Sequence, residues 1–313
     1  MSNLNEELKA LEEAFEVFPY RINDVKFKLK PTFLYQREDR SKFFWPREMS
    51  YEEVYNVADA ILTPMVGEKK ITPRACLVER FFDDALEKYS SEKSDFNYEF
   101  RHYMGFFLSA LSNLAIKDET PITLQVRELG KQMDGLGSFL KESRVRVEGH
   151  TKDFTGAGMN DGELIIKGDA GNYLGATMSG GRITVNGKVG DKFGQEMEGG
   201  EITINGDAGR LGAEKMKNGV ITINGNVGDS LGYYMNNGTI TINGNVGENL
   251  GFFMNDGTIF LPNKESLKAV SSSRYGGKIY YGKKLSRRKV LDTREFPRTI
   301  EEFAKNLNKS GSQ

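Results

Sequence analysis

Hydrophobic positions return at one fixed interval along the second half of the chain. Two glycine columns keep the same step, one running from Gly162 to Gly257 and the other from Gly168 to Gly244. Methionine also recurs every 19 residues, at Met159, Met178, Met197, Met216, Met235 and Met254. Self-similarity at a fixed period is the signature of a solenoid, in which each repeat is one unit stacked on the last.

Each unit predicts one short strand. In one copy, Ile221 and Ile223 alternate with Thr222 and Asn224, so the strand has one apolar face. A single unit is too short to bury that face alone, and its copies must stack. We therefore predict a right-handed parallel β-helix of 19-residue coils with about seven to eight turns. Equivalent positions would then form columns, including an inner isoleucine file and two outer polar ladders. The ladders are Thr184, Thr203, Thr222 and Thr241, and Asn186, Asn205, Asn224 and Asn243.

The first 120 residues have helical periodicity instead. Apolar stripes run through Leu8, Leu11 and Phe15, and a longer one is expected from about residue 95 to 116. Further helices are expected after Ser50 and Thr72, a strand at "VKFKLK", and a short final helix near residue 300. All but two of the 35 glycines follow residue 129, and no proline lies between Pro121 and Pro262.

These patterns predict three parts. Residues 1–121 are expected to form a mostly α-helical domain, residues 122–282 the β-helix, and residues 283–313 a charged tail with a short helix. An uncovered stack of parallel strands would recruit other chains. We therefore expect the N-terminal domain or the tail to cover the open ends.

Composition restricts the partners. The net charge of the 313-residue chain is -1, which argues against nucleic acid or a membrane held by bulk charge. The single cysteine, Cys76, excludes an internal disulfide and is expected in a helix core. No apolar run reaches membrane-spanning length, and the start "MSNLNEELKALEEAF" lacks the features of a signal peptide. A cytoplasmic location is expected.

Charges alternate in sign down the predicted columns. Opposite charges meet in three columns, Glu163–Arg182–Glu201, Asp169–Lys188–Asp207 and Asp191–Arg210–Asp229, and in two pairs, Glu196–Lys215 and Glu198–Lys217. A glycan-cleaving site would need free paired carboxylates. Asp229 over Glu248 is the like-charge pair in these columns, so a glycan-active β-helix is the less favoured hypothesis. His102 and His150 lack partners at metal-ligand spacing. We expect no catalytic, cofactor-binding or metal-binding residue and no cofactor.

Four aromatic residues gather in the last full coils. Tyr233 is expected to lie over Phe252, and Tyr234 over Phe253, where earlier coils have small or polar residues. Interface cores favour aromatic side chains, so these four are the candidate partner-contact residues. Alternatively, the chain's own tail or N-terminal domain covers them. The basic stretch from Lys283 to Lys289 either binds an acidic partner or is a solvated charge run.

The repeat resembles a known family. The unit G-x-x-M-x-x-G-x-I-x-I-x-G occurs in "GQEMEGGEITINGDAG" and "GYYMNNGTITINGNVG", and it is similar to the GXGXG β-helix family. That domain forms the C-terminal part of the glutamate synthase large subunit, and it also forms one of the subunits of formylmethanofuran dehydrogenase. The resemblance covers about residues 122 to 282. The first 120 residues match neither relative, and nothing resembles the amidotransferase or flavin and iron–sulfur regions of glutamate synthase.

The resemblance implies a rigid, non-catalytic body that holds catalytic domains or subunits together. We therefore expect a scaffold or assembly subunit that binds protein partners, such as larger oxidoreductase or amidotransferase subunits. Two alternatives stay open. One is an enzyme, with a site in the N-terminal domain or a glycan-active β-helix. The other is a self-associating structural protein that forms homo-oligomers through the aromatic residues.

Overall fold

The computed structural model describes residues 4–16, 51–71, 73–89, 96–115, 121–126, 133–282 and 289–291. A helix over residues 4–16 precedes α2 (Tyr51–Gly67), α3 (Ala75–Tyr89) and α4 (Phe96–Leu114). The strand predicted at "VKFKLK", the final helix, the basic stretch before Lys289, and the caps at Ser50 and Thr72 lie outside the described residues. None of the described helices is long and apolar enough to cross a membrane.

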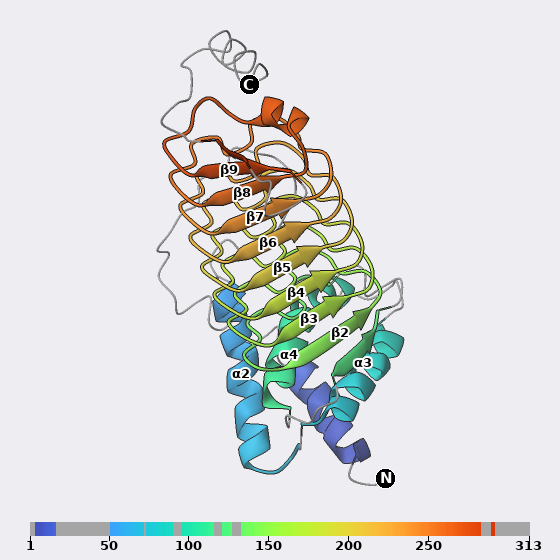
Figure 1. The fold of residues 1–313 in the computed structure, drawn as a ribbon. Coiled ribbons are helices and arrows are strands. Elements are labelled where there is room, and N and C mark those ends of the chain that lie inside the picture. The colour runs from blue at the N-terminus through green and yellow to red at the C-terminus, as the bar shows by residue number, and fades with distance from the viewer. Residues whose placement is uncertain are drawn as a thin grey trace, which may run out of the picture.

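The rest of the described chain is a β-solenoid of about eight turns, which confirms the predicted fold class (Figure 1). Its strands stack in chain order. They are β1 (Ile122–Gln125), β2 (Arg144–Glu148), β3 (Glu163–Ile166), β4 (Arg182–Val185), β5 (Glu201–Ile204), β6 (Val220–Ile223), β7 (Thr239–Ile242), β8 (Thr258–Leu261), β9 (Lys278–Tyr281) and β10 (Lys289–Leu291). The division of the chain into domains at residue 121 stays a prediction.

The register of the sheet reproduces the sequence period. From β2 to β8 the paired residues lie 19 positions apart and run in parallel, as Ile202 and Ile221 do. The inner isoleucine file and all six methionines of the repeat are buried. A second line of parallel bridges runs from Ala170 to Val246. The coil therefore has one regular strand and one further point of backbone contact between neighbouring coils.

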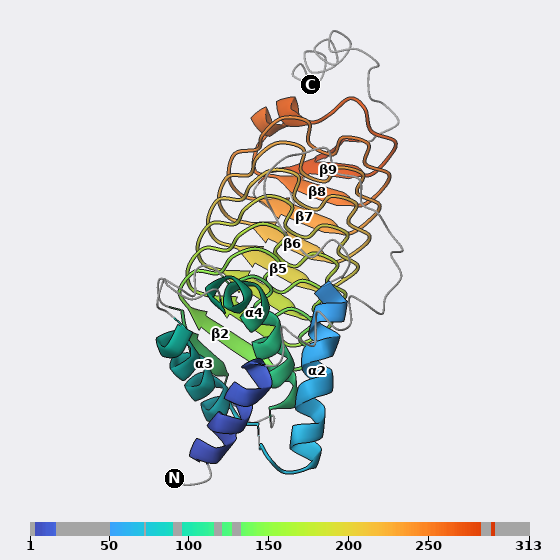
Figure 2. The same cartoon turned by 180° about the vertical axis from the view of Figure 1, so that it is seen from behind.

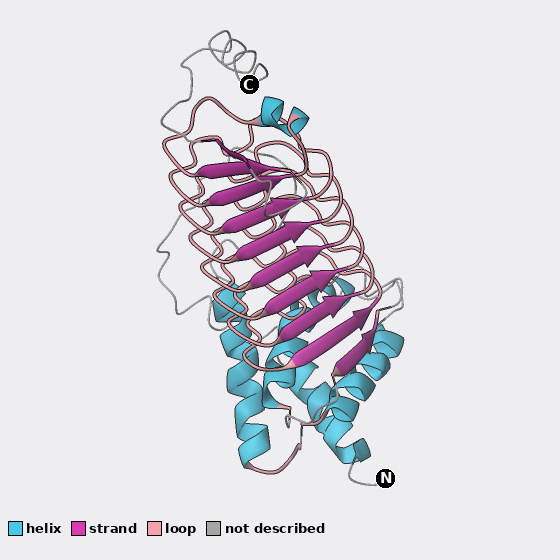
Figure 3. Cartoon of the chain, in the orientation of Figure 1, coloured by secondary structure: helices cyan, strands magenta, loops and turns pink. Residues whose placement is uncertain are grey.

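Helices cover the first coils. Figures 1, 2 and 3 place them together at the N-terminal end of the solenoid. α4 packs against α2 and α3, and α3 packs against β1. α4 approaches the first coil so closely at Gly105 that a methyl group there would clash with the carbonyl oxygen of Asp134. Glu79 of α3 accepts the backbone N–H of Thr123 at 2.6 Å. The helices and the solenoid thus share one apolar core.

The other end of the stack is formed by the last coil and a returning strand. The short 3₁₀ helix η2 (Glu265–Ala269) inserts the buried side chain of Leu267. β10 then pairs with β9 in the antiparallel direction, unlike every other pair in the sheet. These three tail residues, Lys289–Leu291, therefore cover part of the edge of the last coil, as expected for the tail.

Methionine and glycine share one period because they pack on each other. A methyl group on Gly219 would lie 2.7 Å from the Met197 Cε of the preceding coil, and the column members Gly181, Gly200, Gly238 and Gly257 are placed in the same way. Gly219 also has a φ of +101°, which side chains other than glycine rarely adopt. Steric room and backbone conformation both require glycine at this position.

Replacing Gly219 tests these two causes separately. Gly219→Ala is expected to lower the free energy of unfolding by about 1–3 kcal/mol, because it combines a strained φ with a clash. Met197→Ala alone should cost about 2–5 kcal/mol by leaving a cavity. In the Met197→Ala background, adding Gly219→Ala should cost clearly less than it does alone, as measured by urea unfolding. An equal cost in both backgrounds would mean that φ alone dictates the glycine.

Candidate functional site

The aromatic residues predicted to stack do so. They lie in the turns between β6 and β7 and between β7 and β8. Tyr233 stacks on Phe252 with ring centroids 5.8 Å apart, and Tyr234 lies 5.1 Å from Phe253. The last coil adds Tyr275, whose ring stacks on Phe253 at 5.6 Å. We call these five residues the aromatic cluster. Sequence columns did not reveal Tyr275, because the last coil is out of step with the repeat.

The aromatic cluster is partly open to solvent. Tyr275 is 70% exposed, and the other four rings are of intermediate exposure. Partial burial raises the pKa of the Tyr233 hydroxyl, and the neighbouring Tyr234 raises it further. Whether the tail covers the cluster depends on residues outside the described ranges.

The turn does not require aromatic side chains. Tyr234 and Phe253 have φ values of 54° and 56°, in the left-handed region that costs residues other than glycine about 1 kcal/mol or more. Gly158 occupies the same position in an earlier coil, with a φ of 64°. The backbone path is therefore set by the coil, and glycine fits it. The coils between carry other side chains there with the same φ of 55–56°, namely Thr177, Glu196 and Lys215. The backbone therefore does not require a ring at this position.

The predicted charge columns are largely confirmed. Ion pairs join Arg182 to Glu201 at 2.9 Å and Lys217 to Glu198 at 2.6 Å, with three more between neighbouring coils. Those three are Lys188–Asp207, Arg210–Asp191 and Lys215–Glu196. The asparagine ladder is confirmed too, with amide nitrogens donating to the previous coil's amide oxygens at 2.7–3.1 Å. The threonines of the outer ladder pair in register.

One half-buried ion pair was missed. Lys192 Nζ lies 3.0 Å from Glu214 Oε2, and Gln195 donates to the same oxygen at 3.0 Å. Lys192 also lies over the ring of Tyr173, which stacks on Phe154 at 4.6 Å. Lys192 and Glu214 are 22 residues apart, so they do not fall in one column when the sequence is aligned at its period of 19 residues.

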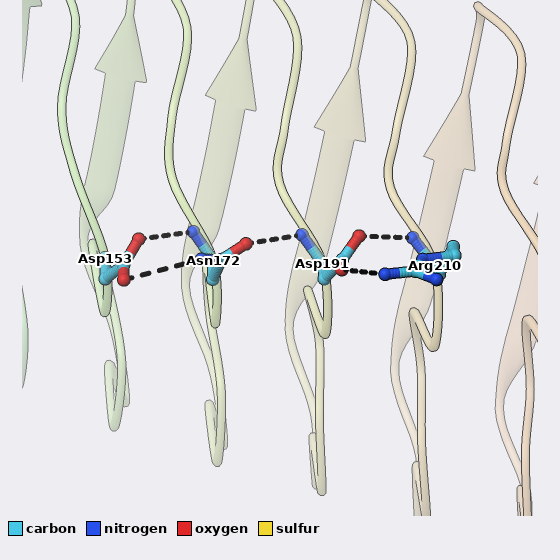
Figure 4. Close-up of polar contacts among 4 residues, drawn as sticks. All are labelled: Asp153, Asn172, Asp191 and Arg210. Carbon is cyan, nitrogen blue, oxygen red and sulfur yellow. Dashed lines mark hydrogen bonds and ion pairs between the residues drawn. The ribbon is translucent and has the colours of Figure 1, made fainter. Parts of the chain in front are cut away.

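A second kind of ladder links side chains to backbone. Asp153 Oδ1 accepts the N–H of Asn172, Asn172 Oδ1 that of Asp191, and Asp191 Oδ1 that of Arg210, all at 2.8 Å (Figure 4). Arg210 also donates through its guanidinium to Asp191 Oδ2. Asp229 continues the column by accepting the N–H of Glu248 at 2.8 Å. The predicted like-charge pair, Asp229 and Glu248, is therefore joined by a hydrogen bond from the backbone of Glu248 to the carboxylate of Asp229.

The structure places two of the three residues considered for metal binding or for the core, His150 and Cys76 but not His102. His150 Nδ1 accepts the backbone N–H of Asp169 at 3.0 Å and so begins a neighbouring column of the same kind. Cys76 is exposed, so the prediction that it lies in the core was wrong. The buried stripe of α3 contains Leu77, Phe81 and Ala85, and Cys76 lies outside it. The side chain of His102 is outside the described set. In the described part of the chain, no three His, Cys, Asp or Glu residues are grouped as metal ligands.

A pair of acidic residues lies where the helices meet the solenoid. Asp134 and Asp153 occupy one column, 19 residues apart, and are 0% and 6% exposed. Burial raises the pKa of Asp153, and the charge of Asp134 raises it further, against the hydrogen bonds from Asn172. A substrate in solvent reaches neither carboxyl group in this conformation. The burial of both side chains therefore indicates a role in the fold.

Together the fold and its ladders define a parallel β-solenoid protein whose outer polar groups bond from coil to coil. A family model, the GXGXG motif, matches residues 101–310 of the chain. The chain therefore belongs to the GXGXG family. A comparison with curated proteins found no match.

The raised pKa of Asp153 generates a pH-dependent prediction. A carboxyl group with a raised folded-state pKa destabilises the fold when ionised, and this cost disappears as pH falls through that pKa. Asp153→Asn should therefore raise the melting temperature at pH 7, since an amide oxygen still accepts the Asn172 N–H as Asn172 does for Asp191.

The measurement is thermal unfolding followed by circular dichroism from pH 7 downwards. The advantage of Asp153→Asn over the parent chain should shrink as pH falls. Asp207→Asn, at an exposed ladder position, is the matched control and should show a smaller gain at pH 7. A lower melting temperature for Asp153→Asn at pH 7 would contradict the account of Asp153.

Proposed function

We propose that this protein is a non-catalytic assembly subunit whose solenoid holds partner catalytic subunits in the cytoplasm. The observation that carries the proposal is a change of surface along the stack. Twelve charged residues lie between 182 and 217, whereas only Asp229, Glu248 and Asp256 lie in the longer stretch 218–262. We call residues 218–262 the neutral segment.

The neutral segment also bears apolar side chains on its outer surface. Among the described residues, Val220 on β6 is a large hydrophobic side chain with 41% exposure. On the outward face of β8 and β9, Phe260 stacks on Tyr280 at 5.1 Å, where the preceding strand has Thr241. Four residues of the aromatic cluster lie in the neutral segment, in the turns outside the sheet.

These features are typical of a protein interface. Interface cores are depleted of charged residues and enriched in Tyr and Phe, and a large exposed apolar patch on a soluble protein marks an interaction site. In the charged coils, by contrast, side chains bond mainly to equivalent side chains of neighbouring coils. Those coils supply stiffness, and the neutral segment supplies the contact. A partner surface without net charge, able to accept aromatic rings, fits it.

An enzymatic role has weaker support. The carboxyl groups that stack at the junction of helices and solenoid, Asp134 and Asp153, are buried. Three carboxylates of the charge columns, those of Asp191, Glu198 and Glu201, are engaged by cations of adjacent coils. Self-association through the aromatic cluster is the second alternative, since a second copy would present the same neutral, aromatic surface.

Native mass spectrometry of the chain, affinity-purified from its own cells, tests the proposal. A stoichiometric complex with a flavin-, molybdenum- or glutaminase-type subunit is expected, because the role is to hold catalytic subunits. A lone monomer would contradict it. A homo-oligomer would instead support the self-association hypothesis. The mass of the assembly formed by the purified chain alone distinguishes a homo-oligomer from a complex with other subunits.

Substitutions in the neutral segment then locate the contact. Phe252→Ser with Phe253→Ser is expected to release the partner while the chain still melts cooperatively, because both rings are only partly buried. Gln195→Ser with Glu196→Ser changes the equivalent positions three coils earlier and should leave the complex intact. Loss of the partner in both variants, or in neither, would rule out the aromatic cluster as the contact.

A further inference from the structure

Six Asn–Gly dipeptides lie in the solenoid, in two structural settings. They are Asn186–Gly187, Asn205–Gly206, Asn218–Gly219, Asn224–Gly225, Asn237–Gly238 and Asn243–Gly244. In an Asn–Gly pair the backbone nitrogen of the glycine can attack the carbon of the side-chain amide, because glycine has no Cβ to obstruct it. Whether this occurs in a folded protein depends on how the two groups are held.

Four of the pairs lie on the outer ladder, where the amide is held away from its own backbone. Asn205 Nδ2 donates to Asn186 Oδ1 at 3.1 Å, and Asn205 Oδ1 accepts from Asn224 Nδ2 at 2.8 Å. The glycine nitrogen is engaged as well, since the Gly206 N–H donates to the Gly187 carbonyl at 3.1 Å. Both reacting groups of the Asn205 pair therefore have partners in other coils.

Asn237 is held differently. It lies exposed in the corner between Met235 and β7, and the Gly238 N–H donates to its own Oδ1 at 2.8 Å. The equivalent corners repeat this contact at 2.7 Å, from Gly162 to Asp161 and from Gly257 to Asp256. The fold of the corner therefore brings the glycine nitrogen against the side-chain carbonyl group of the preceding residue.

We propose that Asn237 is a site of spontaneous deamidation, set by the coil corner. The Gly238 nitrogen loses its proton to solvent base and bonds to Cγ of Asn237. The Cγ–Nδ2 bond breaks, and Nδ2 leaves as ammonia after taking up protons. Water then opens the resulting succinimide at either carbonyl, which yields aspartate or isoaspartate. Water is the only co-reactant, and no oxidant or reductant is needed.

The product disturbs the stack at a sensitive position. Isoaspartate adds one carbon to the main chain of a coil that must match its neighbours at 19 residues. It does so next to Gly238, which packs against Met216 Cε so closely that a methyl group would lie 2.7 Å away. Either product also places a new negative charge one coil from Asp256. Deamidation therefore loosens the neutral segment from within.

Site-resolved mass spectrometry of the full chain, aged at pH 8 and 37 °C, tests the proposal. Cleavage after acidic residues separates Asn224 from Asn237, because Asp229 lies between them. Electron-transfer fragmentation then distinguishes Asn237 from Asn243 and aspartate from isoaspartate. Asn237 is expected to deamidate about tenfold faster than Asn224 or Asn243, because of these three amides only that of Asn237 lies against its attacking nitrogen.

A denatured control separates structure from local sequence. In urea the three sites should react at similar rates, since the corner and the ladder are both lost. Equal rates in the folded chain, or a ladder asparagine reacting first, would overturn the proposal. So would a preference for Asn237 that persists unchanged in urea. Asn237→Ser should abolish the product at this site without changing the rate at Asn224.

Discussion

Each coil of this solenoid takes its position from the coil before it, through contacts that recur every 19 residues. Carboxylate or amide oxygens accept the backbone N–H of the equivalent residue one coil later, and each methionine of the repeat lies beneath a glycine of the following coil. Because side chains of a strand alternate between faces, a one-residue shift would turn isoleucines outward and polar residues inward. The interval is therefore a physical constraint on the whole stack.

The surface of the stack has two parts that differ in charge. Between residues 182 and 217, side chains of opposite charge bond along the stack, which leaves little for a partner to engage. Where the columns lose charge, aromatic rings occupy positions that the backbone does not need them to fill. Tyr234 and Phe253 show this most directly, because earlier coils adopt the same φ with a glycine, a threonine, a glutamate or a lysine. A stiff body with an uncharged, aromatic region on its surface fits the assembly role proposed above.

The period alone was enough to predict the strands, the inner files, the outer ladders and the stacking of Tyr233 on Phe252, since all follow from one interval. Contacts off that interval were not predictable. Lys192 meets Glu214 diagonally across a turn, and Tyr275 joins the aromatic cluster from a coil of different length. Nor could sequence show that Asp153 is buried, because the helices that meet the solenoid near it are distant in the chain.

The shared core of helices and first coils also bears on how the molecule forms. A solenoid gains stability one neighbour at a time, and its first coil has no earlier coil to pair with. Here α4, which precedes the solenoid in the chain, supplies that missing surface by packing on the first coil at Asp134. The helical end thus acts as a template, on which later coils can be added in order as the chain leaves the ribosome.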